Sequence, residues 1–75
     1  MADCVLDARG LACPLPLLKT KKALRELVAG QTLGVFATDA GSWRDFAVFA
    51  ERSGHLLLEA RDNGSEYYYL LQCQH

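Results

Sequence analysis

Cys13 stands out because two closely spaced prolines follow it. The segment GLACPLPLL, at residues 10–18, places Pro14 directly after the cysteine and Pro16 two positions further on. Proline is tolerated in the first turn of a helix, because the first N–H groups of a helix have no partner within it. We therefore predict that a helix begins here, with Cys13 as its N-cap residue, Pro14 at the first helical position and Pro16 at the third.

This position favours a reactive thiol. Between the two prolines, the N–H of Leu15 is the main local donor left for the Cys13 sulfur, and the positive end of the helix dipole lies beside it. Both effects predict a lowered pKa for the thiol and a larger fraction of the nucleophilic thiolate. No cysteine lies at C-x-x-C spacing from Cys13, so accepting and handing on a group suits it better than dithiol redox cycling. A buried structural cysteine is the open alternative.

The other two cysteines give no sign of a metal or disulfide site. Cys4 and Cys73 complete an odd set of three cysteines without paired spacing, which argues against a disulfide framework and against zinc. We expect free thiols, no metal and no cofactor. Cys73 could be a second thiol, but Cys4 and Cys73 are more simply explained as small hydrophobic residues, and His55 as a strand-edge residue.

The helix after Cys13 also carries a candidate docking surface. Leu15 and Leu18 project away from the apolar stripe that would face the core, and Lys19, Lys22 and Arg25 follow them. An apolar spot beside the thiol, bordered by cations, suits an acidic partner protein. Isolated exposed leucines on an ordinary solvated helix face are the alternative.

The elements that must position these residues follow the order β-α-β-α-β-β. We predict strands at 4–8 and 32–38 and helices at 14–29 and 43–53, the second opened by a capping box of Ser42 and Asp45. Each helix has an apolar stripe that would face the core: Pro16, Leu17, Thr20, Ala23, Leu24, Leu27 and Val28 in the first, and Trp43, Phe46, Phe49, Ala50 and Ser53 in the second. Asn63-Gly64 predicts a hairpin with a two-residue turn. That turn would pair Arg61 with Glu66 and would place Leu56 and Leu58 on the face that packs against the helices.

This order predicts an α+β fold: a two-layer α/β sandwich in which both helices pack on one face of a four-stranded mixed sheet. At 75 residues and 51% hydrophobic content the chain is expected to form one domain, over residues 1–75. A net charge of −1 argues against general nucleic-acid binding. The first ten residues lack a signal-peptide pattern and no apolar run could span a bilayer, so we expect a cytoplasmic protein without membrane contact.

The segment LDARGLACPLPLLKTKKAL resembles the TusA family of sulfur-carrier proteins, whose hallmark is a C-P-x-P motif at the start of the first helix. Here that motif is Cys13-Pro14-Leu15-Pro16; Asp7 and Gly10 upstream and a TD…GS…DF pattern over residues 38–46 also match. The resemblance implies the same β-α-β-α-β-β sandwich. It also implies a sulfurtransferase in which Cys13 carries sulfane sulfur as a persulfide, supported by the rest of the motif and by Asp7 and Gly10.

The resemblance further implies partner proteins. A cysteine desulfurase or a rhodanese would load the carrier, and the thiol of an acceptor protein would unload it, in tRNA thiolation, molybdenum-cofactor assembly or sulfur oxidation. The sequence does not distinguish these pathways. Two other hypotheses remain at this stage: a non-catalytic interaction or regulatory module that uses the Leu15, Leu18 and lysine face, and RNA binding through the KTKK segment, which the near-neutral charge disfavours.

Overall fold

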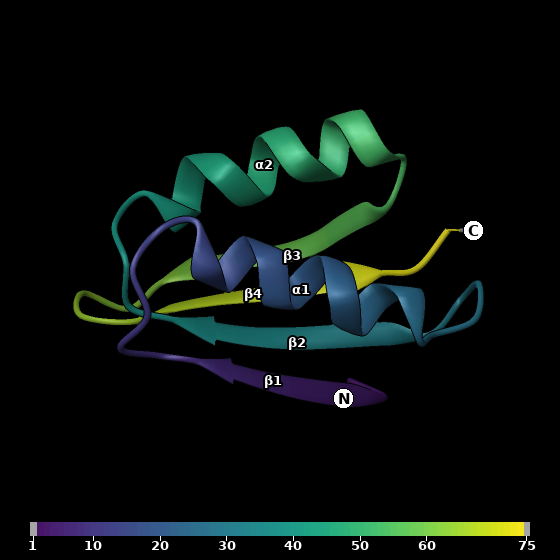
Figure 1. Ribbon diagram of the computed structural model, residues 1–75, viewed down its shortest axis with the longest axis horizontal. Helices are drawn as coiled ribbons and strands as arrows, with labels where there is room; N and C mark the ends of the chain where they lie inside the picture. The colour runs from purple at the N-terminus through teal and green to yellow at the C-terminus, as the bar shows by residue number, and fades with distance from the viewer. Residues whose placement is uncertain (1, 75) are drawn as a thin grey trace.

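The computed structural model describes residues 2–74, in which four strands and two helices follow the predicted order. Figure 1 shows two layers, with both helices above one face of a single sheet. The predicted two-layer α/β sandwich is therefore confirmed. The elements are β1 (Cys4–Ala8), α1 (Leu15–Arg25), β2 (Thr32–Ala37), α2 (Ser42–Ser53), β3 (Leu56–Asp62) and β4 (Tyr67–Gln72).

The sheet is mixed, with strand order β1-β2-β4-β3. β1 and β2 are parallel, and Ala8 at the end of β1 lies opposite Ala37 at the end of β2. β4 runs antiparallel to both β2 and β3. Because β1 and β2 are parallel, the loops that lead from them into α1 and α2 leave the same edge of the sheet, at the left in Figure 1.

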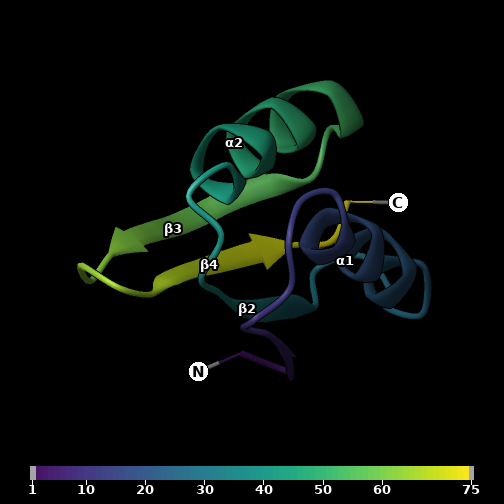
Figure 2. The same cartoon turned by 60° about the vertical axis from the view of Figure 1, so that its left-hand side comes forward.

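The core lies between the helices and the two central strands. Along β2 and β4, alternate side chains point toward the helices, as the period of a half-buried strand requires. Leu33, Val35 and Ala37 of β2, together with Tyr69 and Leu71 of β4, are buried in this way. The view in Figure 2 shows α2 crossing above β3 and β4 while α1 lies beside it.

Phe46 fixes α2 to the sheet. Its ring stacks on that of Tyr69 with 4.3 Å between the centroids, and both side chains are fully buried. Burying a ring of this size stabilises the fold by about 2–3 kcal/mol. Trp43, which the sequence placed on the same apolar face, is instead 44% exposed and leans its ring toward Tyr67 and Tyr69 at the rim of the core.

α1 is shorter than predicted. It ends at Arg25 rather than at residue 29, because the next two N–H groups bond to carbonyls three residues back, at 3.1 and 3.2 Å, which tightens and closes the last turn. Val28, expected in the core stripe, therefore lies outside the helix and is 65% exposed. The buried residues of α1 do follow the predicted stripe: Pro16, Thr20 and Leu24.

The hairpin between β3 and β4 has a longer loop than predicted. Asp62 pairs with Tyr67, so residues 63–66 form a four-residue connection rather than a two-residue turn. The carboxylate of Asp62 accepts a hydrogen bond from the N–H of Gly64 at 2.9 Å. A short acidic side chain that closes its own turn in this way competes with the tight hairpin that Asn63-Gly64 favours by itself.

The longer loop changes the register of the hairpin. Arg61 lies opposite Tyr68 and forms an ion pair with Glu59 of its own strand, so the predicted cross-strand pair with Glu66 is wrong. Because the register moves by two residues, Tyr67 still faces the core side of the sheet.

A bulge then reverses the predicted burial at the start of β3. The register shifts between Leu57 and Glu59, which leaves Leu58 as the extra residue of the bulge. Leu57 packs against the core. Leu56 and Leu58, which the sequence placed there, are 48% and 50% exposed.

Candidate functional site

Cys13 lies on the loop that enters α1, exposed at the edge of the sheet where β1 ends. The predicted helix start is wrong by one residue: Pro14 is the N-cap, Leu15 opens the helix and Pro16 is at its second position. The Cys13–Pro14 peptide bond is cis. Both prolines nevertheless lie where a helix loses no internal hydrogen bond, as the sequence predicted.

The shift by one residue removes the donor expected for the sulfur. The N–H of Leu15 donates to the carbonyl of Ala12 at 2.9 Å and therefore closes the turn that carries Cys13. Among the described residues, no side chain forms a capping hydrogen bond at the N-terminus of α1. The predicted stabilisation of a Cys13 thiolate by the Leu15 N–H is thus wrong.

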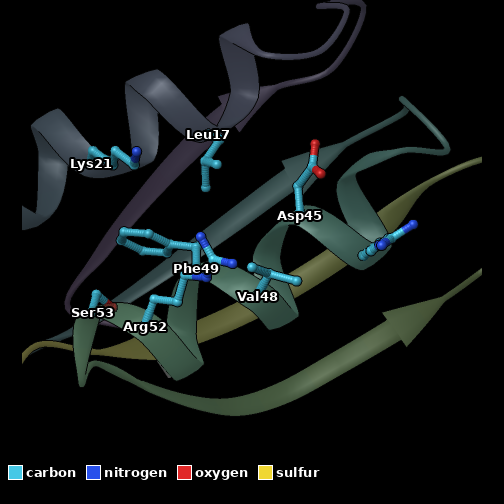
Figure 3. Close-up of a pocket in the computed structure, with 8 residues that line it drawn as sticks. Leu17, Lys21, Asp45, Val48, Phe49, Arg52 and Ser53 are labelled. Atoms are coloured by element: carbon cyan, nitrogen blue, oxygen red, sulfur yellow. The ribbon is translucent and has the colours of Figure 1, made fainter.

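The partner of the thiol comes from the second helix. Cys13 Sγ donates a hydrogen bond to Asp45 Oδ2 at 3.1 Å, which joins the loop before α1 to the first turn of α2. Figure 3 shows the Asp45 side chain near the start of α1. A small depression lies beside Cys13. It is lined by the two motif prolines, by Leu17 of α1 and by residues that follow β2: Asp39, Ser42, Asp45 and Phe46.

This contact reverses the predicted electrostatics. The pKa of the Cys13 thiol is raised above its ordinary value, first by the hydrogen bond to Asp45, then by desolvation and by the charges of Asp45 and Asp39. A carboxylate accepts the thiol proton and repels the thiolate, so the uncharged form is favoured. The prediction of a lowered pKa considered only the Leu15 N–H and the dipole of the helix, and could not include an acid on another helix.

Asp7 and Gly10 shape the loop that leads to Cys13. The Asp7 carboxylate accepts bonds from the backbone N–H of Arg9 at 3.0 Å and from its guanidinium at 2.9 and 3.0 Å. These contacts lower the pKa of Asp7 to about 2. Gly10 has a φ of 80°, a conformation that favours glycine, and its N–H donates to Thr38 Oγ1 at 2.9 Å. The loop after β1 is thereby tied to the loop after β2.

Ser42 fixes the start of α2, the helix that carries Asp45. Predicted as the N-cap of α2, it instead follows the N-cap Gly41, and its buried hydroxyl donates to the Asp39 carbonyl at 2.7 Å. Since a hydroxyl has one hydrogen, the Tyr69 hydroxyl must donate to Ser42 Oγ, at 2.7 Å. The predicted capping box does not form, because Ser42 points into the protein and Asp45 points toward Cys13.

An open groove of about 660 Å³ runs between the two helices, beginning at Asp45. In Figure 3, Leu17 points into it from α1 while Val48 and Phe49 lie on the side of α2. Cations border these apolar side chains, and Lys21 Nζ lies 5.7 Å from the centre of the Phe49 ring. The cations that line the groove are Lys21, Arg44 and Arg52.

The predicted docking residues lie on the surface of α1. Leu15 is 46% exposed and Leu18 is 52% exposed. Lys19, Lys22 and Arg25 are exposed as well. The structure thus places this set on the helix that begins beside Cys13, and its role in docking stays a prediction.

The remaining candidates lie away from the site. Cys73 is fully buried and its thiol points at the carbonyls of Leu24 and Leu27, 3.7 Å from each. Cys4 is exposed on β1, at the opposite end of that strand from the loop that carries Cys13. His55 accepts a hydrogen bond from the backbone of Gln74 at 2.9 Å. Within residues 2–74, no group of His, Cys, Asp or Glu side chains could hold a metal ion.

Asp45 is the residue that sequence reasoning missed at this site. Its spacing from Ser42 suggested a helix cap, which is a local role. The available signal was topological: two parallel strands that are each followed by a helix bring both helix starts to one edge of the sheet. Residues after the second strand were therefore the place to look for a partner of Cys13.

The structure thus places an exposed thiol just before the first helix of a small α/β sandwich. Residues 5–72 match the model of the family "Sulfurtransferase TusA". The sulfur carrier protein TusA of Allochromatium vinosum is 46% identical over 70 residues, which cover 93% of this chain and 92% of that protein. The putative sulfur carrier protein YrkI of Bacillus subtilis is 52% identical over 63 residues, 84% of each chain.

A solved structure agrees with this match. The crystal structure of a SirA-like protein from Desulfitobacterium hafniense superposes with a TM-score of 0.82 at 27% identity, over 96% of this chain and 99% of that one. The chain therefore belongs to the TusA family of sulfur carriers, as the C-P-x-P resemblance indicated, and has a role in sulfur relay. No helix within residues 2–74 is long and apolar enough to cross a membrane.

Proposed function

We propose that Cys13 carries sulfane sulfur as a persulfide, loaded by a cysteine desulfurase or a rhodanese and unloaded by the thiol of an acceptor protein. The observation that supports this most directly is the exposure of Cys13 within the C-P-x-P motif of a chain that belongs to a sulfur-carrier family. The sulfur is covalently bound cargo, so the proposal needs no cofactor.

The transfer is balanced between two cysteines. Cys13 Sγ, as the thiolate, attacks the outer sulfur of the donor's persulfide; a new S–S bond forms at Cys13 and the donor's S–S bond breaks. The electron pair leaves on the donor's cysteine sulfur, which takes up a proton equivalent to the one that Cys13 lost. No external oxidant or reductant is required, and the acceptor repeats the same exchange.

Mass spectrometry of the intact protein tests the proposal. After incubation with a cysteine desulfurase and cysteine, or with a rhodanese and thiosulfate, the wild-type chain should gain the mass of one sulfur atom, which a reductant then removes. Cys13→Ser should not gain it. Cys4→Ser, which removes the other exposed thiol, is the matched control and should load as the wild type does.

Two results would refute the proposal. One is an adduct that persists in Cys13→Ser, and the other is a wild-type chain that neither donor loads while each donor still transfers sulfur to a small thiol. If Cys4→Ser failed to load just as Cys13→Ser does, unfolding of the variants would be the cause. Circular dichroism of each variant detects such unfolding.

The proposal includes a docking surface on α1, made of Leu15, Leu18, Lys19, Lys22 and Arg25. Its two leucines are about half exposed on the helix that Cys13 precedes, so a partner seated there would place its own cysteine within reach of the carrier thiol. Its cations suit an acidic surface on that partner. The pathway that the partner serves, whether tRNA thiolation, molybdenum-cofactor assembly or sulfur oxidation, depends on the identity of the acceptor.

A further inference from the structure

The thiol of Cys13 faces acidic groups and no cation in its immediate surroundings. Asp45 Oδ2 lies 3.1 Å from Sγ, and Asp39 lines the same small depression. Among the described residues, these are the titratable side chains around the sulfur, and no lysine, arginine or histidine lines the depression. Cysteines that are ionised at neutral pH have cationic side chains nearby instead, because a positive charge stabilises the thiolate.

Contacts of the residues before and after Asp45 fix its position. Asp45 lies in the first turn of α2, and the preceding Ser42 is bonded to Asp39 and to the buried Tyr69 of β4. One residue further along α2, the ring of Phe46 is stacked on that of Tyr69. The carboxylate is therefore attached to the core of the protein, while Cys13 is on a surface loop.

The hydrogen bond from Cys13 Sγ to Asp45 requires the hydrogen of an empty, uncharged thiol. A thiol has one hydrogen, and Asp45 accepts it; Sγ of a persulfide has no hydrogen, because the outer sulfur has replaced it. The outer sulfur of a loaded carrier is an anion or a weak acid beside a carboxylate. Like charges repel. Asp45 therefore binds the empty thiol but repels the anionic outer sulfur of a Cys13 persulfide.

We propose that Asp45 is a positioning residue of the carrier site, which holds the empty Cys13 as an uncharged thiol and releases it when sulfur is bound. This inference rests on the proposed function of Cys13. It can nevertheless be tested without sulfur transfer, because the hydrogen bond controls the reactivity of the thiol toward any electrophile. The free, empty carrier is thereby kept from reacting with small electrophiles that require the thiolate.

The pH dependence of alkylation tests this inference without sulfur or partner. Iodoacetamide reacts with the thiolate, and peptide mass spectrometry follows Cys13, Cys4 and Cys73 separately in the intact chain. Asp45→Asn keeps the shape of the side chain and removes its charge. We expect the rate profile of Cys13 to move to lower pH, with the rate at neutral pH rising about tenfold for each unit of the move.

Matched controls separate this effect from general charge and from unfolding. Glu51→Gln makes the same charge change on the exposed side of α2 and should leave the profile unchanged. Cys73 is fully buried, so its alkylation in any variant reports loss of the fold. An unchanged Cys13 profile in Asp45→Asn, or an equal move in Glu51→Gln, would overturn the inference. Failure of wild-type loading would refute the proposed function and leave this result intact.

Discussion

At the scale of single residues, two acids near the loop after β1 act in opposite ways because their partners differ. Asp7 accepts bonds from a guanidinium, which favours the carboxylate and lowers its pKa to about 2. Asp45 accepts a bond from a neutral thiol, which favours the thiol and raises the pKa of Cys13. Asp7 thus stabilises the shape of the loop, whereas Asp45 acts on the Cys13 sulfur.

Arg9→Gln should raise the pKa of Asp7. The pKa of an unperturbed aspartate is about 3.9, whereas the pKa of Asp7 in the folded protein is about 2. The stabilisation from this pair is therefore complete above about pH 4 and is lost as pH falls through the folded-state pKa near 2. NMR titration of the Asp7 side-chain carboxyl carbon measures the midpoint, which should return toward the ordinary value in the variant.

The control for this titration is Arg61→Gln. Arg61 pairs with Glu59 on β3, so its loss removes one surface cation without touching Asp7. A midpoint for Asp7 that moves equally in both variants would show that general surface charge, rather than the Arg9 contact, sets the pKa of Asp7.

Sequence reasoning at this scale found the residues but not their partners. Cys13, Asp7 and Gly10 could be identified from their types and spacing. The hydrogen bonds to the sulfur could not, because spacing predicts contacts only within one turn or one helix. Asp45 is 32 residues from Cys13 along the chain, and a one-residue error at the helix start was enough to assign the Leu15 N–H to the wrong acceptor.

At the scale of elements, the sequence predicted the order and the layers, and it failed where a local signal competed with packing. The apolar stripes of α1 and α2 identified the buried Leu24 and Phe46. Asn63-Gly64 favoured a tight turn, yet the loop has four residues. Because of the bulge at Leu58, Leu57 packs against the core. Three successive leucines do not indicate at which of them a bulge will occur.

The buried link between α2 and β4 should be measurable as stability. Tyr69→Phe removes the donor to Ser42 while Ser42 keeps its bond to Asp39, so we expect a loss of about 0.5–1.5 kcal/mol in the free energy of unfolding. Ser42→Ala leaves the buried Tyr69 hydroxyl without this acceptor and should cost more, about 1–3 kcal/mol. Urea denaturation measures both variants.

Tyr68→Phe is the control for this pair. Tyr68 neighbours Tyr69 on β4 and points to the opposite face of the sheet, where its ring contacts Phe36. The double variant of Ser42 and Tyr69 should lose less stability than the sum of the single losses, because the two residues share one bond. A Tyr69→Phe variant as stable as Tyr68→Phe would contradict the assigned link.

At the scale of the whole molecule, a nearly neutral chain concentrates cations on one side. The net charge is −1, yet the exposed surface of α1 carries Lys19, Lys22 and Arg25. The adjoining groove between the helices adds Lys21, Arg44 and Arg52. Local charge of this kind steers encounter with a partner of opposite charge even when the total is small.

Lys22→Gln should therefore slow the loading of Cys13 by a cysteine desulfurase without changing the thiol itself. Charges at the rim of an interface act mainly on the rate of encounter, and salt screens them over about 8 Å at physiological ionic strength. We expect a several-fold slower loading rate at low salt and a weaker dependence on salt than in the wild type. Mass spectrometry of the loaded protein at timed intervals measures the rate.

Two controls show whether the effect of Lys22→Gln is due to docking. Arg61→Gln removes one cation from the edge strand β3, outside the docking surface, and should load at the wild-type rate. Alkylation of Cys13 should be equally fast in all three proteins, because Lys22 is not among the residues around the sulfur. If Lys22→Gln loaded as quickly as Arg61→Gln at low salt, the cations of α1 would have no part in docking the donor, and the groove beside Asp45 would become the surface to test next.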